Sequence, residues 1–288
     1  MANVAIVTDS VADLPPERAA AAGITVIPLS LSFGDREYLA GEEISTDEFW
    51  RQLTAPGAPF PKTGAASPGR FQEAFERVLA SGAEAIVYVG VGSTLSATVR
   101  SAEIARDAMG GQQMGGQRIH IVDSESASMA IGILAEMAAE LAAQGTSAEE
   151  IVKTLESRKR DTRLYVVLDT LEYLKRGGRI SAARAAIGEV LSVKPIITVE
   201  KGTVEVADRV RTRSKARARL LELLTELPVE RIAVLHGQAP EVEAFAAELA
   251  ERAGIERSRV SVQPIGASVG PHVGPGSYGA VVLRRPQG

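Results

Sequence analysis

Short apolar runs alternate with longer amphipathic stretches through the first half of the chain. The apolar runs predict buried strands at residues 4–8, 25–33, 85–91 and 119–123. Apolar residues at helical spacing predict helices at residues 68–79, 95–109, 126–144 and 147–159. Because strands that alternate with helices form parallel sheets covered by helices, we expect an N-terminal α/β domain over residues 1–162. Such sheets bind ligands in the loops at the carboxyl ends of their strands.

The second half of the chain has a different pattern. Two β-branched segments, 194–200 and 203–210, flank Lys201-Gly202 and predict a hairpin. Further strands are predicted at residues 231–236, 259–265 and 280–284, with two helices between them. This pattern predicts a C-terminal α+β domain over residues 163–288 with a mostly antiparallel sheet. The boundary follows a basic helix end, Arg158-Lys159-Arg160.

The composition is that of a folded globular protein. Of the 288 residues, 45% are hydrophobic and 24% charged, and the formal net charge of -4 gives no overall attraction to nucleic acid or anionic lipid. The chain has no cysteine, which excludes disulfides, thiolate metal sites and a cysteine nucleophile. No apolar run approaches the roughly 18 residues of a membrane span, and the first residues lack the basic stretch of a signal peptide. We therefore expect a cytoplasmic protein that does not insert into membranes.

One of only three histidines, His272, lies in a segment rich in glycine and proline at residues 266–276. The glycines and prolines predict turns and argue against a helix. An imidazole there titrates near neutrality and can donate to an oxyanion, although an incidental histidine in a turn is the simpler interpretation. The start of the segment also matches G-x-S-x-G around Ser268, the nucleophile elbow of serine hydrolases. That elbow needs a helix directly after the serine, and the glycines and prolines of this segment argue against one.

Hydroxyl-rich turns precede two of the predicted helices. Residues 90–98 include Ser93, Ser96 and Thr98, whose hydroxyls and free backbone N–H groups can hold an anion or simply cap the helix. The turn does not fit the known nucleotide-binding motifs, because it has neither a full G-x-G-x-x-G nor the lysine of a Walker motif. At residues 62–68, Ser67 before a proline predicts a helix cap, whereas Thr63 lies outside that cap and needs another explanation.

Two further clusters allow more than one interpretation. Asp9 and Asp13 follow the first predicted strand and could hold Mg²⁺, or could cap the next helix. The basic segment 209–219 includes Arg209, Arg211 and Arg213, which share one face if extended. That segment is either a solvated surface or a docking site for an acidic protein, and the acidic chain with few aromatics argues against nucleic acid.

Seven motifs occur together in an order that resembles the DegV family of bacterial fatty-acid-binding proteins over nearly the whole chain. They are Thr8-Asp9-Ser10 with Asp13-Leu14, Lys62-Thr63, residues 93–98 with Ser101-Ala102, Val122-Asp123-Ser124, residues 171–181, Lys194-Pro195, and residues 272–276. The resemblance implies two α/β domains with one fatty acid buried between them. It further implies that the protein is a monomeric carrier without a cofactor or metal, which performs no chemistry and delivers the fatty-acid carboxylate to a separate fatty-acid kinase.

The resemblance also implies roles for the residues of this chain that occupy the family's motif positions. The resemblance implies that Thr63 and Ser96 bind the carboxylate, with Ser93 in the same motif, His272 nearby and Arg179 supporting the network. The chain departs from the family pattern next to Thr63, where Gly64-Ala65-Ala66 replaces serine-glutamine-proline.

Two more departures lie in the motif that includes Ser96. Ala97 replaces a glycine, and Gly92 replaces the first of two paired serines. Both changes leave the hydroxyl of Ser96 in place. The alternative function is a small-molecule enzyme, a phosphotransferase or hydrolase, that uses residues 93–98 for a phosphate and His272 as acid or base.

Overall fold

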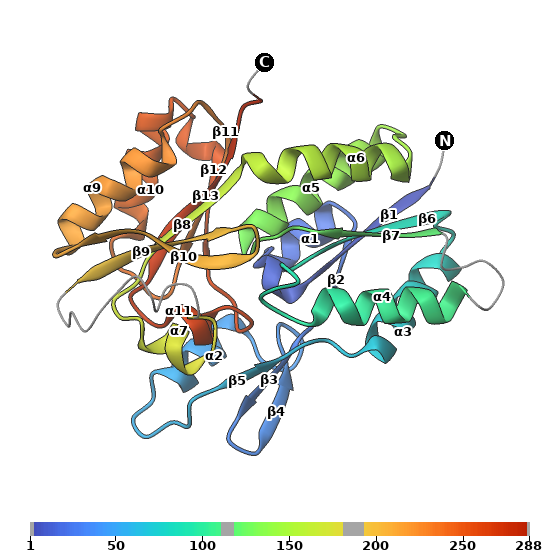
Figure 1. Ribbon diagram of the computed structural model, residues 1–288, viewed down its shortest axis with the longest axis horizontal. Coiled ribbons are helices and arrows are strands. Elements are labelled where there is room, and N and C mark those ends of the chain that lie inside the picture. Colours follow the sequence, from blue (N-terminus) through green and yellow to red (C-terminus); the bar gives the residue numbers. More distant parts are fainter. Residues whose placement is uncertain (1–2, 111–117, 181–192, 287–288) are drawn as a thin grey trace.

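The computed structural model describes residues 3–110, 118–180 and 193–286, and its first half is built on a parallel sheet (Figure 1). In spatial order the strands are β2 (Ile24–Ile27), β1 (Val4–Asp9), β6 (Ala85–Gly90) and β7 (Ile119–Asp123). The helices are α1 (Pro16–Ala21), α3 (Pro68–Ala80), α4 (Thr98–Gly110), α5 (Met129–Ala143) and α6 (Ala148–Arg158). Helices α5 and α6 cover one face of the sheet and α3 and α4 the other, as the alternating pattern predicts.

The second half is built on a six-stranded, mostly antiparallel sheet. In spatial order the strands are β10 (Thr203–Val210), β9 (Lys194–Glu200), β8 (Thr162–Val167), β13 (Tyr278–Arg284), β11 (Val229–His236) and β12 (Val260–Pro264). Only β11 and β12 pair in parallel, so the predicted sheet type is confirmed. Helices α9 (Arg213–Leu224) and α10 (Val242–Ala253) pack on its outer face, while α7 (Glu172–Arg176) and α11 (Gly270–Val273) lie at one end.

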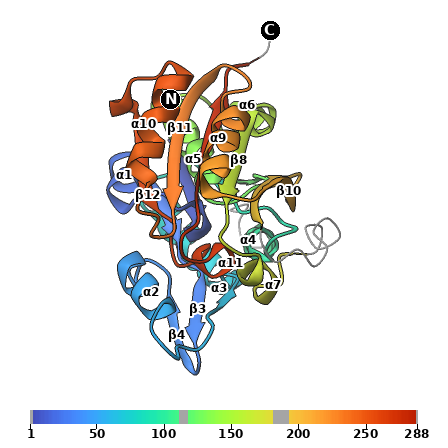
Figure 2. The ribbon, with the colours of Figure 1, turned by 90° about the vertical axis from the view of Figure 1, so that its left-hand side faces the viewer.

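A third, small antiparallel sheet was not predicted. It consists of β4 (Arg36–Leu39), β3 (Ser30–Phe33) and β5 (Lys62–Gly64), and α2 (Thr46–Leu53) lies beside it at one end of the molecule (Figure 2). The predicted strand at 25–33 is therefore wrong as a single element. The chain turns around Pro28, and the N–H of Leu29 donates to the Ser10 hydroxyl at 2.9 Å instead of continuing the ladder of β2.

Three other differences lie near the loops. Helices α4 and α5 each begin three residues later than predicted, because serine hydroxyls hold the preceding backbone in turns. For example, the N–H of Thr98 donates to the Ser96 hydroxyl at 3.3 Å. The expectation that residues 266–276 contain no helix is also wrong. A single helical turn forms there because proline is tolerated at its start, and it ends at Gly274, whose φ is +73°.

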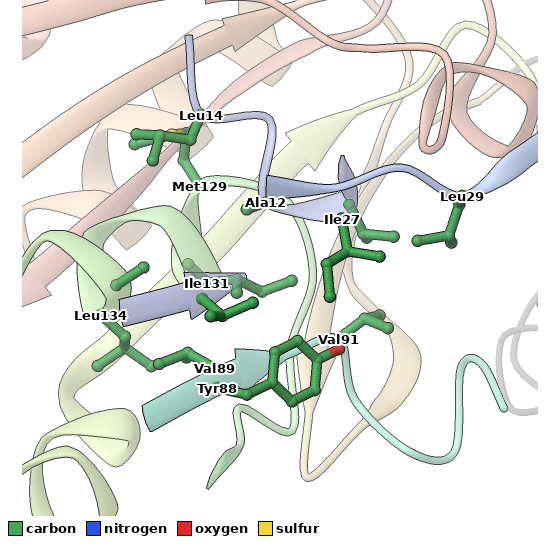
Figure 3. Packing of buried hydrophobic residues seen from close by; sticks show 14 of the residues in the cluster. Ala12, Leu14, Ile27, Leu29, Tyr88, Val89, Val91, Met129, Ile131 and Leu134 are labelled. Carbon is green, nitrogen blue, oxygen red and sulfur yellow. The ribbon is translucent and has the colours of Figure 1, made fainter. Parts of the chain in front are cut away.

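The hydrophobic core continues from the first sheet into the inner face of the second. Figure 3 shows buried residues of the first half that belong to one apolar cluster, among them Tyr88, Leu134 and Met129, which lies beside Leu14. The same cluster includes Leu235 and Val281 of the second half. The two halves thus meet along an apolar seam. No helix within the described ranges is long and apolar enough to cross a membrane.

Candidate functional site

A cavity with a volume of about 100 Å³ lies in this seam, beyond the carboxyl end of β1. Most of its wall is apolar and comes from both halves of the molecule, including Val11, Leu29, Val91, Leu164, Val166, Ile197 and Leu235. Its polar side chains are Thr63, Ser96, Ser128, Arg179, Ser268 and His272. The structure therefore brings together four of the five residues to which the motifs assign head-group binding.

Thr63 and His272 form the direct polar contact at this cavity. The Thr63 hydroxyl lies 3.1 Å from Nε2 of His272. Thr63 is held by the pairing of β5 with β3, and His272 by the single turn of α11. That turn packs closely on the first half because Gly270 lies against the rings of Phe49 and Trp50, where a side chain would not fit. The contact thus depends on two segments that are 209 residues apart.

His272 is held in its neutral form. Burial, together with the nearby positive charge of Arg179, lowers the pKa of His272 to about 4. Its Nδ1 is buried and has no hydrogen-bond partner among the described residues. Gly177 lies directly against Nδ1, so that any side chain at this position would collide with the imidazole. A neutral imidazole can donate one hydrogen bond and accept another, which suits a carboxylate beside a hydroxyl.

Arg179 connects the second half to the turn that follows β6. Its Nε donates to the Leu95 carbonyl at 3.1 Å, and its Nη1 donates to the Gly177 carbonyl at 2.7 Å. Two carbonyls thus hold the guanidinium beside the cavity, and no carboxylate of the described residues forms an ion pair with it. Its positive charge therefore lies at the cavity wall.

Ser96 lies at the cavity, but Ser93 does not. The Ser96 hydroxyl lies 2.8 Å from that of Thr98 and accepts from the Thr98 N–H, which makes it both a cap and part of the wall. Ser93 is exposed, and its N–H donates to the carboxylate of Asp123 at 3.2 Å. The assignment of Ser93 to the head group is not supported by this geometry. A neighbouring carboxylate at that N–H also argues against a phosphate in this turn.

Comparison with known proteins agrees with the order of the motifs. A family model described as "Uncharacterised protein, DegV family" matches residues 3–285. The chain belongs to the DegV family. It is 40% identical to a DegV domain-containing protein of Streptomyces coelicolor, over 98% of this chain and 99% of that protein.

Two solved DegV structures share the fold of the whole chain. A DegV family protein from Thermus thermophilus, described by its fatty-acid binding, is 33% identical with a TM-score of 0.88, over 98% of this chain and 100% of that one. DegV from Bacillus subtilis, described as a fatty acid binding protein, is 32% identical with a TM-score of 0.85, over 99% and 100% of the two chains. The predicted family and fold class are confirmed.

The cavity of this DegV protein includes serines whose position the motifs did not predict. The Ser268 hydroxyl lies 2.7 Å from that of Ser10, and Ser128 donates to Asp13 at 2.5 Å. Ser268 is the serine of the G-x-S-x-G match. Its hydroxyl pairs with another serine and not with His272, so no described base activates it for hydrolysis.

The carboxylates of Asp9 and Asp13 are used within the DegV fold itself. Asp9 is fully buried and accepts from the Tyr88 hydroxyl at 2.6 Å and from the N–H groups of Val11 and Val91. Burial raises the pKa of Asp9 in spite of these donors. In the described part of the chain, no three acidic or histidine side chains come together to hold a metal. The magnesium interpretation therefore has no support in the structure.

The basic segment does not form one converging surface. Arg209 and Arg211 are exposed, whereas Arg213 forms ion pairs with Asp169 and Glu241 at 2.6 and 2.5 Å. Arg217 and Arg219 are likewise paired with acidic residues of the same half. Arg209, Arg211 and Arg213 would share one face if the segment were extended, but β10 ends at Val210 and α9 begins at Arg213, so that condition is not met. Ser181, the last residue of the motif at 171–181, lies outside the described residues.

Proposed function

We propose that this DegV family protein binds one long-chain fatty acid in the cavity between its two halves, which we take as domains divided near residue 162. The carboxylate lies at Thr63, Ser96, His272 and Arg179, and the acyl chain lies along the apolar wall. The observation that carries the proposal is the gathering of these four polar residues at one cavity whose remaining wall is almost entirely apolar. The described ligands of the Thermus and Bacillus structures support the same class of ligand.

The head-group residues suit a carboxylate. Hydroxyls, a neutral imidazole and a guanidinium can replace the water that a buried carboxylate loses, and bonds to a charged partner are stronger than neutral ones. The guanidinium of Arg179 supplies the opposite charge beside the Thr63–His272 pair. These contacts orient the ligand at one end of the cavity.

The tail supplies most of the binding free energy. A chain of roughly 14 buried methylenes has a gross transfer free energy on the order of 11 kcal/mol, before the cost of ordering the chain. The cavity of about 100 Å³ is smaller than the roughly 300–1,000 Å³ of ligand pockets. Binding therefore requires the apolar walls on the two sides of the seam to move apart.

Extraction of the purified protein tests this proposal. Protein expressed in bacteria is extracted with organic solvent, and the extract is analysed by mass spectrometry for acyl chains. We expect about one fatty acid per protein. A thermal-shift series with fatty acids on one side and nucleotides with Mg²⁺ on the other provides the comparison with an enzyme. Recovery of no acyl chain, together with stabilisation by nucleotide alone, would overturn the proposal.

We further propose that the protein acts as a carrier that presents the carboxylate to a fatty-acid kinase and performs no chemistry itself. Arg209 and Arg211 are the exposed arginines of the basic segment, and we propose that they dock on an acidic surface of the kinase. Charge reversal by Arg211→Glu is expected to slow acyl-phosphate formation at low salt, with fatty-acid binding unchanged, because exposed charges mainly steer association. Lys153→Glu on α6 is the control, since Lys153 is also exposed and the substitution makes the same change in charge. Equal kinase rates for both variants and the wild type would contradict docking at Arg211.

A further inference from the structure

A second pocket, with a volume of about 440 Å³, lies behind the serines of the fatty-acid cavity. Its wall comes from the loop after β1, from the turn after β4 and from β12. Ser268 belongs to the walls of both pockets, and its hydroxyl pairs with Ser10. The volume is within the range of small-molecule sites.

The wall of this second pocket contains a buried amide, that of Gln263. It is 5% exposed, and neither its Oε1 nor its Nε2 has a hydrogen-bond partner among the described residues. In the parallel register of β11 and β12, Gln263 is opposite Leu235. Paired residues of neighbouring strands point to the same face, and Leu235 faces the first half of the molecule. The amide therefore points toward the second pocket, where it can accept and donate a hydrogen bond.

Asp13 supplies a negative charge at the same pocket. Its Oδ1 accepts from the N–H of Gly266 at 2.8 Å, and its Oδ2 accepts from the Ser128 hydroxyl. An ionised carboxylate has about four acceptor positions, so these two donors leave room for a ligand. The other charged groups of the described wall are also acidic, Glu17 and Glu42, and both are exposed. Among the described residues, this wall has no lysine, arginine or histidine.

We propose that the second pocket binds a small organic cation, a primary ammonium group on a short apolar body, with Asp13 as its counter-ion and Gln263 as its hydrogen-bond partner. The two exposed glutamates at the wall favour entry of a positive charge. The apolar remainder of the wall, which includes Leu14 and Val26, suits a hydrocarbon body. A metal ion fits less well, because the described acidic residues do not cluster as metal ligands do.

The pH dependence of binding follows from Asp13. The pKa of Asp13 is raised to about 7, because burial and the negative charge of Asp9 raise it by more than the bonds from Ser128 and Gly266 lower it. The ammonium group requires the ionised carboxylate. Affinity is therefore expected to rise with pH up to about 7 and to level off above it.

Calorimetric titration of the full chain with n-butylammonium chloride tests the site, with n-butanol as the neutral probe of similar shape. We expect butylammonium and not butanol to bind, with at least tenfold loss of affinity in Asp13→Asn and several-fold loss in Gln263→Leu. Glu251→Gln on α10, an exposed change outside this pocket, is the control and is expected to bind as the wild type does. The readout is the binding of butylammonium, which has no acyl chain or carboxylate, so failure of this site and failure of the proposed fatty-acid function are distinguishable.

The same titration at pH 5.5 and pH 8 keeps the proposal testable if a variant fails to fold. The wild type is expected to bind butylammonium at least tenfold more weakly at pH 5.5 than at pH 8. Three results would each overturn the proposal: no binding of butylammonium to the wild type, equal binding of butanol, or unchanged affinity in a folded Asp13→Asn protein.

Discussion

Neutral, buried His272 makes the stability of the protein depend on pH in a way that a single substitution can isolate. Its folded-state pKa is about 4, whereas a free histidine titrates at 6.5. Between these values the unfolded chain binds a proton that the folded chain does not. The free energy of unfolding therefore falls as the pH is lowered from 6.5 to 4 and is insensitive to this group outside that window.

The magnitude follows from the difference between the two pKa values. A difference of about 2.5 units corresponds to about 3 kcal/mol, at 1.36 kcal/mol per unit. His272→Gln removes the titrating group and keeps a neutral polar side chain. Asp13 acts in the opposite direction, because its raised pKa makes the folded state less stable as the pH rises toward 7. That contribution is present in both proteins and cancels in their difference.

Urea unfolding of wild type and His272→Gln at several pH values between 4 and 7.5 measures the effect. We expect the stability of the wild type, relative to the variant, to fall by about 3 kcal/mol from pH 7.5 to pH 4. If the free energies of unfolding of the two proteins change with pH in parallel over this range, the conclusion that His272 is buried and neutral is refuted. A relative stability that rises toward low pH would show that the imidazole is charged and paired in the folded protein.

Further predictions concern the head group and the glycines. Thr63→Val and Ser96→Ala are each expected to weaken fatty-acid binding by about 1–3 kcal/mol, because a buried carboxylate oxygen loses a donor, whereas Ser93→Ala at the exposed position outside the cavity is expected to change nothing. Competition with a fluorescent fatty acid measures all three, and equal loss in the Ser93 variant would place the head group elsewhere. Gly279→Ala is expected to destabilise the fold by about 1–3 kcal/mol, since its new methyl group would overlap a carbonyl of β8. Gly69→Ala in the first turn of α3 would place its methyl group 4.0 Å from Oγ of Ser67, an ordinary van der Waals contact, and is expected to stabilise the fold by about 0.5–1 kcal/mol. Urea unfolding measures both changes.

Much of the secondary structure is determined locally by the sequence. The run at 85–91 is apolar on both faces, as suits a strand covered on both sides, and it forms β6 at Ala85–Gly90. The short β-branched run at 119–123 forms β7 as predicted. Lys201-Gly202 between two β-branched segments forms the hairpin of β9 and β10, because both residues can adopt the positive φ that the turn requires. The order of the motifs also identified the family and four of the residues that line the cavity.

Other features depended on contacts between distant segments and could not be found from local pattern. Pro28 is a local sign that the run 25–33 is interrupted, but that β2 and β3 join different sheets depends on distant contacts, such as the Ser10 hydroxyl that accepts from the N–H of Leu29. Arg213 resembles its basic neighbours in sequence, but acidic partners from two other segments pair with it.

The sequence by itself determined most strands and helices of the two large sheets, the family of the chain, and which residue types could bind a carboxylate, because each of these depends on short-range pattern and motif order. Only the tertiary structure decided which of those residues meet. Folding placed His272 against Thr63, 209 residues away, left Ser93 in solvent and buried the amide of Gln263 with no hydrogen-bond partner in the described part of the chain. The physical reason is that hydrogen bonding, burial and charge at a site depend on the neighbours that packing supplies, and those neighbours are distant in the chain.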